Sequence, residues 1–95
     1  MPPVLSEKES LTAAAGLLRS LGATEVYVFG SAAKGEPQAG SDLDLAVSGL
    51  PPQVYFSAVS KASDLLGRPV DLVDLNDDTP RVRYLLRSGE LIRVG

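Results

Sequence analysis

The chain has 95 residues, of which 44% are hydrophobic, and its formal net charge is −3 at pH 7. This length suits one compact domain over residues 1–95, with a thin core. The sequence contains no cysteine and no histidine, which excludes disulfides, thiolate or imidazole metal ligands and Ser-His-Asp catalysis. Carboxylate chemistry remains, and carboxylates are the ligands that hard cations such as Mg²⁺ prefer.

The charge pattern also limits the class of partner. The negative net charge provides no general basic footprint for nucleic acid. Arginines do gather late in the chain, and we interpret them as a solvated surface; they are Arg81, Arg83, Arg87 and Arg93. No apolar run is long enough to cross a bilayer, and the first residues lack a signal-peptide pattern, so we expect a cytoplasmic protein.

In the first half of the chain, the pattern predicts a helix followed by two strands. Ser6 and Glu9 form a capping box, apolar residues recur at helical spacing, and Gly22 ends the helix. Residues 25–29 (EVYVF) predict a strand that is covered on both faces, because apolar residues occur at odd and even positions, which point to opposite faces of a sheet. Residues 41–48 (SDLDLAVS) predict the second strand, after a loop over residues 35–40 that is rich in glycine and proline.

The second half alternates in the same way. Pro52 is expected to begin a helix that Gly67 ends. Residues 69–75 (PVDLVDL) predict a third strand. Thr79 caps a last helix that Pro80 begins and Gly89 ends, and the apolar tail after it suggests a short final strand. Helices and strands therefore alternate along the chain, as in a domain built from packed layers.

The stretch GSAAKGEPQAGSDLDL, residues 30–45, carries the chemistry. Residues two apart on a strand point the same way, so Asp42 and Asp44 share a face and lie about 6.6–7 Å apart along the chain. Two carboxylates held this close repel each other unless a cation lies between them, as in sites where two metal ions share a carboxylate. The alternative is a half-exposed edge strand whose polar face happens to be acidic.

Gly30 and Ser31 directly follow a predicted strand. Their backbone N–H groups and the Ser31 hydroxyl can face a phosphate, and a glycine allows the backbone to approach it closely. Lys34 could add a positive charge nearby, or it could be an ordinary surface lysine. Joined to Asp-x-Asp by one short loop, this weak Gly-Ser pattern becomes a much stronger indication of a nucleotide site.

The segment GSAAKGEPQAGSDLDLAV resembles the signature of the polymerase-beta-like nucleotidyltransferase superfamily. The short chain is similar to its minimal members, the minimal nucleotidyltransferase (MNT) antitoxins found beside HEPN-type RNA-cleaving toxins. GRPVDLVDL resembles the family's strand with the third carboxylate, and RYLLRSGELIRV resembles its C-terminal helix and tail. The likeness runs from about Glu25 to the end. It implies an α+β fold with a small mixed sheet flanked by helices.

The resemblance also implies roles for individual residues. Asp42, Asp44 and Asp71 would be catalytic and would hold Mg²⁺, two ions in all, with Asp71 helping to deprotonate the attacking hydroxyl. Gly30 and Ser31, with Lys34 nearby, would bind the phosphates of ATP. The residues alone do not choose between Asp71 and Asp74, which lie on opposite faces of one strand; the family pattern favours Asp71. The remaining late acids, Asp74, Asp77 and Asp78, are interpreted as strand-end and turn residues.

For function, the resemblance implies transfer of AMP from ATP to a tyrosine of a partner HEPN-type toxin, within a hetero-oligomer. A second hypothesis is that the chain neutralises its partner by binding alone. A third is a nucleotidyltransferase with a small-molecule acceptor such as an aminoglycoside. A partner-facing surface would need exposed apolar side chains. The candidates are Tyr55, Phe56, Tyr84 and Ile92, although we expect each of them in the core.

Overall fold

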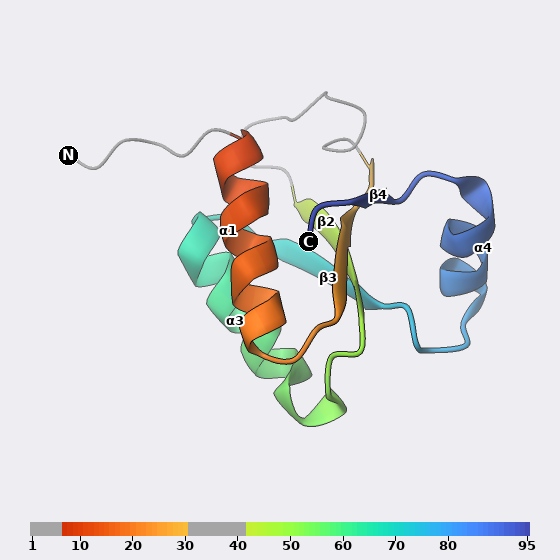
Figure 1. Ribbon diagram of the computed structural model, residues 1–95, viewed down its shortest axis with the longest axis horizontal. Coiled ribbons are helices and arrows are strands. Elements are labelled where there is room, and N and C mark those ends of the chain that lie inside the picture. The colour runs from red at the N-terminus through yellow and green to blue at the C-terminus, as the bar shows by residue number, and fades with distance from the viewer. Residues whose placement is uncertain (1–6, 31–41) are drawn as a thin grey trace.

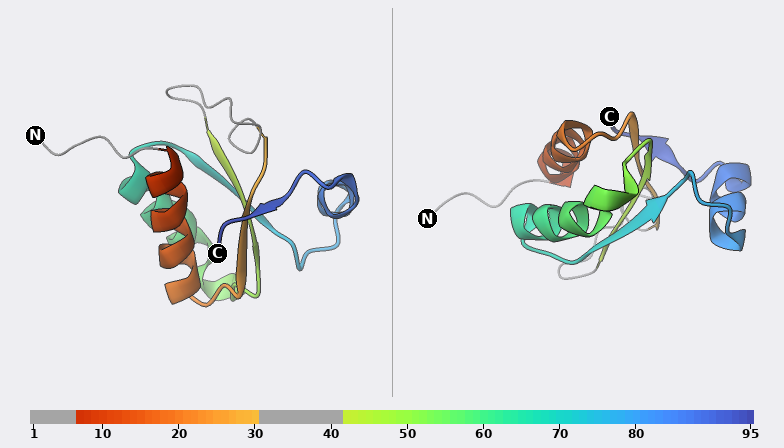
Figure 2. Two further views of the ribbon diagram at one scale, coloured as in Figure 1. Left: turned by 45° about the horizontal axis from the view of Figure 1, so that its top comes forward. Right: turned by 90° about the horizontal axis from the view of Figure 1, so that it is seen from below.

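The computed structural model describes residues 7–30 and 42–95 (Figure 1). Its elements form three layers, with a sheet between two layers of helix. Helices α1 (Glu7–Ser20) and α3 (Tyr55–Leu66) cover one face of the sheet, and α4 (Pro80–Ser88) covers the opposite face (Figure 2). A short 3₁₀ turn, η1 (Pro52–Val54), leads into α3. None of the helices in the described ranges is long and apolar enough to cross a membrane.

The sheet has four strands in the order β3-β2-β1-β4. They are β1 (Glu25–Val28), β2 (Leu43–Ser48), β3 (Val70–Asp74) and β4 (Ile92–Arg93). Strand β1 pairs antiparallel with both β2 and β4, whereas β2 and β3 are parallel. The predicted α+β class with a small mixed sheet is therefore confirmed.

Each face of the sheet has its own apolar core. Alternate strand residues Val26, Leu43 and Leu45 are fully buried against the α1 and α3 side. On the other face, Phe29 and Ala46 pack in a second cluster with α4. Because successive strand residues point to opposite faces, a strand that is apolar at both parities must be covered on both sides. This explains the pattern seen in residues 25–29.

Helix ends follow the local signals in the sequence. Gly67 and Gly89 both adopt the left-handed conformation at the C-caps of α3 and α4. The Thr79 hydroxyl accepts a hydrogen bond from the Val82 backbone N–H at 3.2 Å, so α4 has a real N-cap. The predicted start of the preceding helix is slightly different, because Pro52 begins the 3₁₀ turn and the α-helix starts only at Tyr55.

Two sequence expectations need correction. Asp42 lies one residue before β2, so only Asp44 is within the ladder. The apolar side chains expected in the core are also largely outside it: Phe56 is 85% exposed, and Tyr84 and Ile92 are exposed as well. Of the four candidates, only Tyr55 packs against the main core, as a partly buried residue. The apolar pattern of a short segment does not determine which of its faces another element covers, and that depends on how the elements pack together.

Candidate functional site

The candidate site lies where β2 and β3 begin. In their parallel ladder, Asp44 is the register partner of Asp71. Paired residues in neighbouring strands project from the same face of the sheet, so the two carboxylates lie side by side. Leu43 and Leu45 point to the opposite face and are fully buried there. Packing of these two leucines fixes the face on which Asp44 is presented.

Asp74 occupies a different place. Its register partner is Val47, near the other end of the ladder. Its carboxylate accepts a hydrogen bond from the Asn76 backbone N–H at 2.9 Å, which stabilises the turn after β3. Pairing of the strands thus brings Asp71, and not Asp74, beside Asp44. This is the geometry that the family pattern implied, although the catalytic roles themselves stay predictions.

Gly30 brings the backbone against the Asp44 carboxylate. The Phe29 backbone N–H donates to the Asp44 carbonyl oxygen at 3.1 Å, which continues the pairing of β1 and β2 up to this point. Gly30 follows with φ +71°, and a Cβ atom built on it would overlap the carboxylate oxygen Oδ2 of Asp44. Only glycine meets both conditions, the left-handed backbone and the missing side chain. The other predicted phosphate-binding residues, Ser31 and Lys34, lie outside the described residues.

The environment of Asp44 disfavours its charged form. Burial is the main cause that raises the pKa of this carboxyl, and the negative charges of Asp71 and Asp42 raise it further. Arg81 acts in the opposite direction. Like charges that share a site repel, and a cation placed among them relieves the repulsion. The electrostatics of the carboxylates therefore favour a bound cation.

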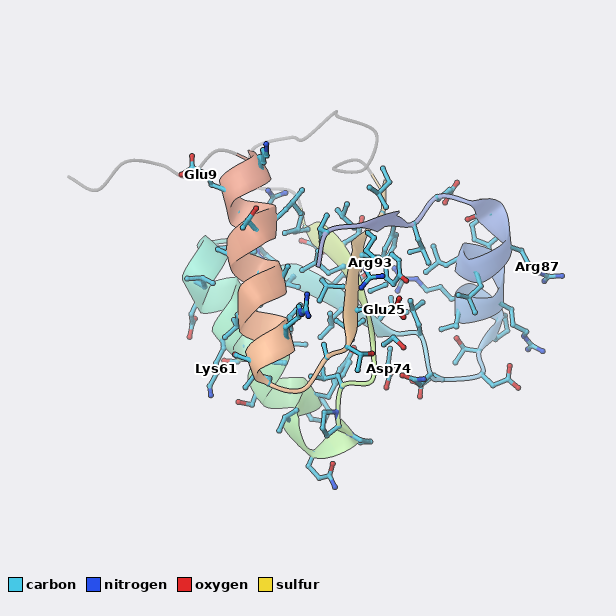
Figure 3. The ribbon with its side chains drawn as sticks, in the orientation of Figure 1. Glu9, Glu25, Lys61, Asp74, Arg87 and Arg93 are labelled. Atoms are coloured by element: carbon cyan, nitrogen blue, oxygen red, sulfur yellow. The ribbon has the colours of Figure 1, made fainter. Side chains whose placement is uncertain are left out.

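Arg81 is a residue of this site that the sequence did not single out. It lies in the first turn of α4, and its Nη2 atom contacts the Asp71 carboxylate oxygen Oδ2 at 2.7 Å. Its guanidinium also lies over the ring of Phe29, with its carbon 5.5 Å from the ring centroid. In the sequence, Arg81 is an arginine just after a predicted helix cap, and an arginine at such a position is usually a surface residue. By contrast, Arg87 on the same helix points outward from the protein (Figure 3).

The donor set fits Mg²⁺ in its chemistry. Carboxylate oxygens are the ligands of a hard cation, and Asp44 and Asp71 are adjacent on a rigid parallel pair of strands. Within the described ranges, however, no three His, Cys, Asp or Glu side chains already form a group that could hold a metal ion. One physical reason is visible, because the Asp71 carboxylate is engaged by Arg81. A second is that Asp42, just before β2, is exposed.

A separate hollow of about 230 Å³ lies away from these carboxylates. Its lining residues are Pro52, Tyr55, Phe56, Asp74 and Asp77. Asp74 ends β3, three residues beyond Asp71, and alternates to the other face of the sheet. The hollow is therefore not part of the candidate site.

Comparison with known protein families identifies the fold. The family model described as polymerase beta, nucleotidyltransferase matches residues 19–93. The chain belongs to this family. No curated protein matches it significantly. The matched range includes both strands that bear the paired aspartates, as well as Gly30 and α4.

Solved structures of nucleotidyltransferases agree with this assignment. One described as a minimal nucleotidyltransferase is 34% identical, with a TM-score of 0.72 and coverage of 88% of each chain. A toxin–antitoxin structure with AMP-PNP is 26% identical with a TM-score of 0.72, and the match covers 94% of this chain and 72% of the other.

A third structure holds a tri-AMPylated HEPN toxin from Shewanella oneidensis in complex with its MNT antitoxin. It has 22% identity and a TM-score of 0.68, with coverage of 93% of this chain and 71% of the other. At this identity the likeness shows the fold alone. Taken with the family match, these neighbours confirm the resemblance to minimal nucleotidyltransferases that the sequence motifs indicated.

Proposed function

We propose that this nucleotidyltransferase is an Mg²⁺-dependent antitoxin that transfers AMP from ATP to a tyrosine of a HEPN-type toxin. The observation that carries the proposal is the pairing of Asp44 with Asp71 on one face of the sheet, with Gly30 packed against the carboxylate of Asp44. Two similar proteins support the choice of nucleotide and acceptor. One is a toxin–antitoxin structure with AMP-PNP, and the other contains an AMPylated HEPN toxin.

Each predicted residue has a role in this proposal. Asp42, Asp44 and Asp71 would hold the metal ions, which when bound neutralise charge on the phosphates and on the attacking and leaving oxygens. Asp71, whose carboxylate lies beside that of Asp44, is assigned as the general base that accepts the proton of the attacking hydroxyl, as the resemblance implies. The backbone of Gly30 approaches the phosphates closely, because it has no side chain there.

Ser31 and Lys34 complete the phosphate-binding part of the proposed site. The Ser31 hydroxyl and the backbone N–H groups after β1 donate hydrogen bonds to phosphate oxygens, and Lys34 adds a positive charge. The reaction balances as a single displacement. A bond forms between the acceptor oxygen and the α-phosphorus of ATP, the bond to the β-phosphate oxygen breaks, and pyrophosphate leaves with its electron pair. The acceptor's proton passes to Asp71.

The test is mass spectrometry of a HEPN-type protein encoded beside this chain, co-expressed with it in the presence of ATP and Mg²⁺. We expect the wild-type chain to add one or more AMP units to a tyrosine. The double variant Asp42→Ala/Asp44→Ala should add none while still binding its partner. The matched control is Asp78→Ala, which removes an exposed acid that pairs with the Arg83 side chain at 3.5 Å, and should leave transfer unchanged.

The alternative hypothesis of neutralisation by binding alone predicts a different result. In that case no adduct forms, and the double variant neutralises the toxin as well as the wild type does. That outcome would refute the proposed transferase activity. Adducts that persist in the double variant would instead refute the assignment of the two aspartates.

A further inference from the structure

We propose that Arg81 is an internal counter-ion of the aspartate pair, so that a divalent cation has to compete with its guanidinium for Asp71. The inference rests on the proposed function, because it concerns the metal site assigned there. It adds a residue that controls how tightly this site holds its metal when no nucleotide is present.

The contact itself is the first step. The Arg81 guanidinium lies 2.7 Å from Oδ2 of Asp71. Oxygen atoms of this carboxylate are the ones that a cation would need. A carboxylate oxygen that accepts a hydrogen bond from a charged N–H group at this distance has less electron density to offer a metal ion. A cation that approaches Asp71 also meets the positive charge of the guanidinium.

The guanidinium is held in place from a second side. Phe29 is buried in the core beneath α4, and its ring lies 5.5 Å from the guanidinium carbon of Arg81. An arginine over an aromatic face gains a cation–π attraction. The backbone is fixed too, because Thr79 caps the helix two residues before Arg81. Ring, cap and carboxylate together define one position for Arg81.

The charge of Arg81 also acts on the second aspartate of the pair, Asp44. Asp44 is the register partner of Asp71 in the parallel ladder, so the guanidinium that contacts Asp71 acts on a pair of neighbouring carboxylates. An arginine guanidinium is always charged near neutral pH. One cation thus acts on both paired carboxylates, as a bound metal ion would.

Because the ion pair is exposed, a metal ion from solution can reach Asp71 and displace the Arg81 guanidinium. The side chains of Arg81 and Asp71 are 52% and 38% exposed. Ion pairs this exposed contribute little to folding, so the protein does not depend on this contact for its stability. A dication carries twice the charge of arginine and can displace it. Removal of Arg81 should therefore leave the protein folded and tighten its metal binding.

The experiment measures Mn²⁺ binding to the full chain without nucleotide, with the free ion followed by electron paramagnetic resonance. We expect Arg81→Gln to lower the Kd for Mn²⁺ about fivefold at low salt, the upper end of what an exposed ion pair supplies. The difference should shrink at high salt, because exposed charges are screened. Arg81→Lys keeps the charge and should lie closer to the wild type. Thermal unfolding of each metal-free variant checks that it is folded.

The matched control is Arg83→Gln, two residues further along α4. Arg83 is exposed and pairs with Asp78 at 3.5 Å, so this variant should bind Mn²⁺ as the wild type does. An unchanged or higher Kd in Arg81→Gln, with the wild type binding normally, would overturn the counter-ion role and leave the proposed function intact. If the wild type and Arg81→Gln bind no Mn²⁺ even with ATP present, the proposed metal-dependent function fails as well.

Discussion

Gly30 is the residue at which the backbone and the carboxylate of Asp44 make their closest approach. A side chain there would have to adopt φ +71° and would also overlap Asp44. Gly67 has nearly the same φ, +66°, but open space where its Cβ would be. The two glycines therefore separate the effect of backbone strain from that of the clash.

We predict that Gly30→Ala lowers the free energy of unfolding by more than Gly67→Ala does. The control should cost about 1–2 kcal/mol, the usual strain of a non-glycine residue in the left-handed region. Only Gly30→Ala should also abolish AMP transfer, because it displaces Asp44. Urea denaturation and the transfer assay measure the two effects. Equal losses of stability, with transfer retained, would show that the close approach is unimportant.

Asp44 is a residue whose charge opposes folding of the metal-free chain. Its pKa is raised in the folded state by burial and by Asp71. The folded chain therefore binds this proton more tightly than the unfolded chain does. The resulting stability is present below the unfolded pKa of an aspartate and is lost as the pH rises through the raised, folded pKa.

We predict that Asp44→Asn stabilises the metal-free chain at pH 7 while it abolishes transfer. The gain should be less than about 1 kcal/mol, because the site is partly exposed and solvent screens the charges. Thermal unfolding in the presence of a chelator measures it. Asp64→Asn, on the exposed part of α3, is the control and should change little. A variant less stable than the wild type would contradict the repulsion between Asp44 and Asp71.

At the scale of elements, α4 depends on its N-cap. The helix has nine residues, and isolated helices this short are marginal. Thr79 supplies a partner for the Val82 N–H at 3.2 Å. The same turn positions Arg81 over Phe29 and Asp71, so fraying of α4 would disturb both the second core and the candidate site.

We predict that Thr79→Ala costs about 1 kcal/mol of folding stability, a typical value for a lost N-cap. Thr12→Ala is the control, because the exposed Thr12 hydroxyl donates a hydrogen bond back to the Lys8 carbonyl oxygen within α1 and caps no helix end. Alanine is the better helix former there, so the control should be neutral or slightly stabilising. Denaturant titration of both variants is the measurement. Equal effects would mean that the cap contributes nothing specific.

At the scale of the whole molecule, the sheet lies between two cores, and its inner strands β1 and β2 contribute residues to both. Leu45 is fully buried in β2, the strand paired to both β1 and β3. We predict that Leu45→Ala costs about 2–5 kcal/mol in the free energy of unfolding. The control Leu86→Ala removes a 59%-exposed side chain from α4 and should cost less than about 0.5 kcal/mol. A small effect at Leu45 would indicate that the site collapses around the cavity.

The outer surface of the molecule also bears on its partners. Phe56 and Tyr84 are exposed on elements from opposite faces of the sheet, so they do not form one contiguous apolar patch. Glu25 and Arg93 lie together across β1 and β4, with Arg93 Nη1 3.3 Å from Glu25 Oε2 (Figure 3). Arg93 places a charged side chain on the edge strand β4, a feature that discourages pairing with another sheet.

Local signals in the sequence determined most of the elements. Thr79 and Pro80 start α4, Gly67 and Gly89 end their helices, and the alternation in residues 43–48 places aspartate opposite leucine. These features depend on backbone dihedral preferences and on spacing, which a short segment contains in full. The Asp-x-Asp motif is also contained within one short segment, and together with Gly-Ser it was sufficient to indicate the family.

Tertiary structure decided which distant residues meet. Parallel pairing of β2 with β3 places Asp71, and not Asp74, beside Asp44. Docking of α4 brings Arg81 to both Asp71 and Phe29. Neither contact is visible in the sequence, because strand register and helix docking depend on the fit between two packed surfaces and not on the pattern within either segment. The sequence thus identified the acids, and only the fold supplied their neighbours.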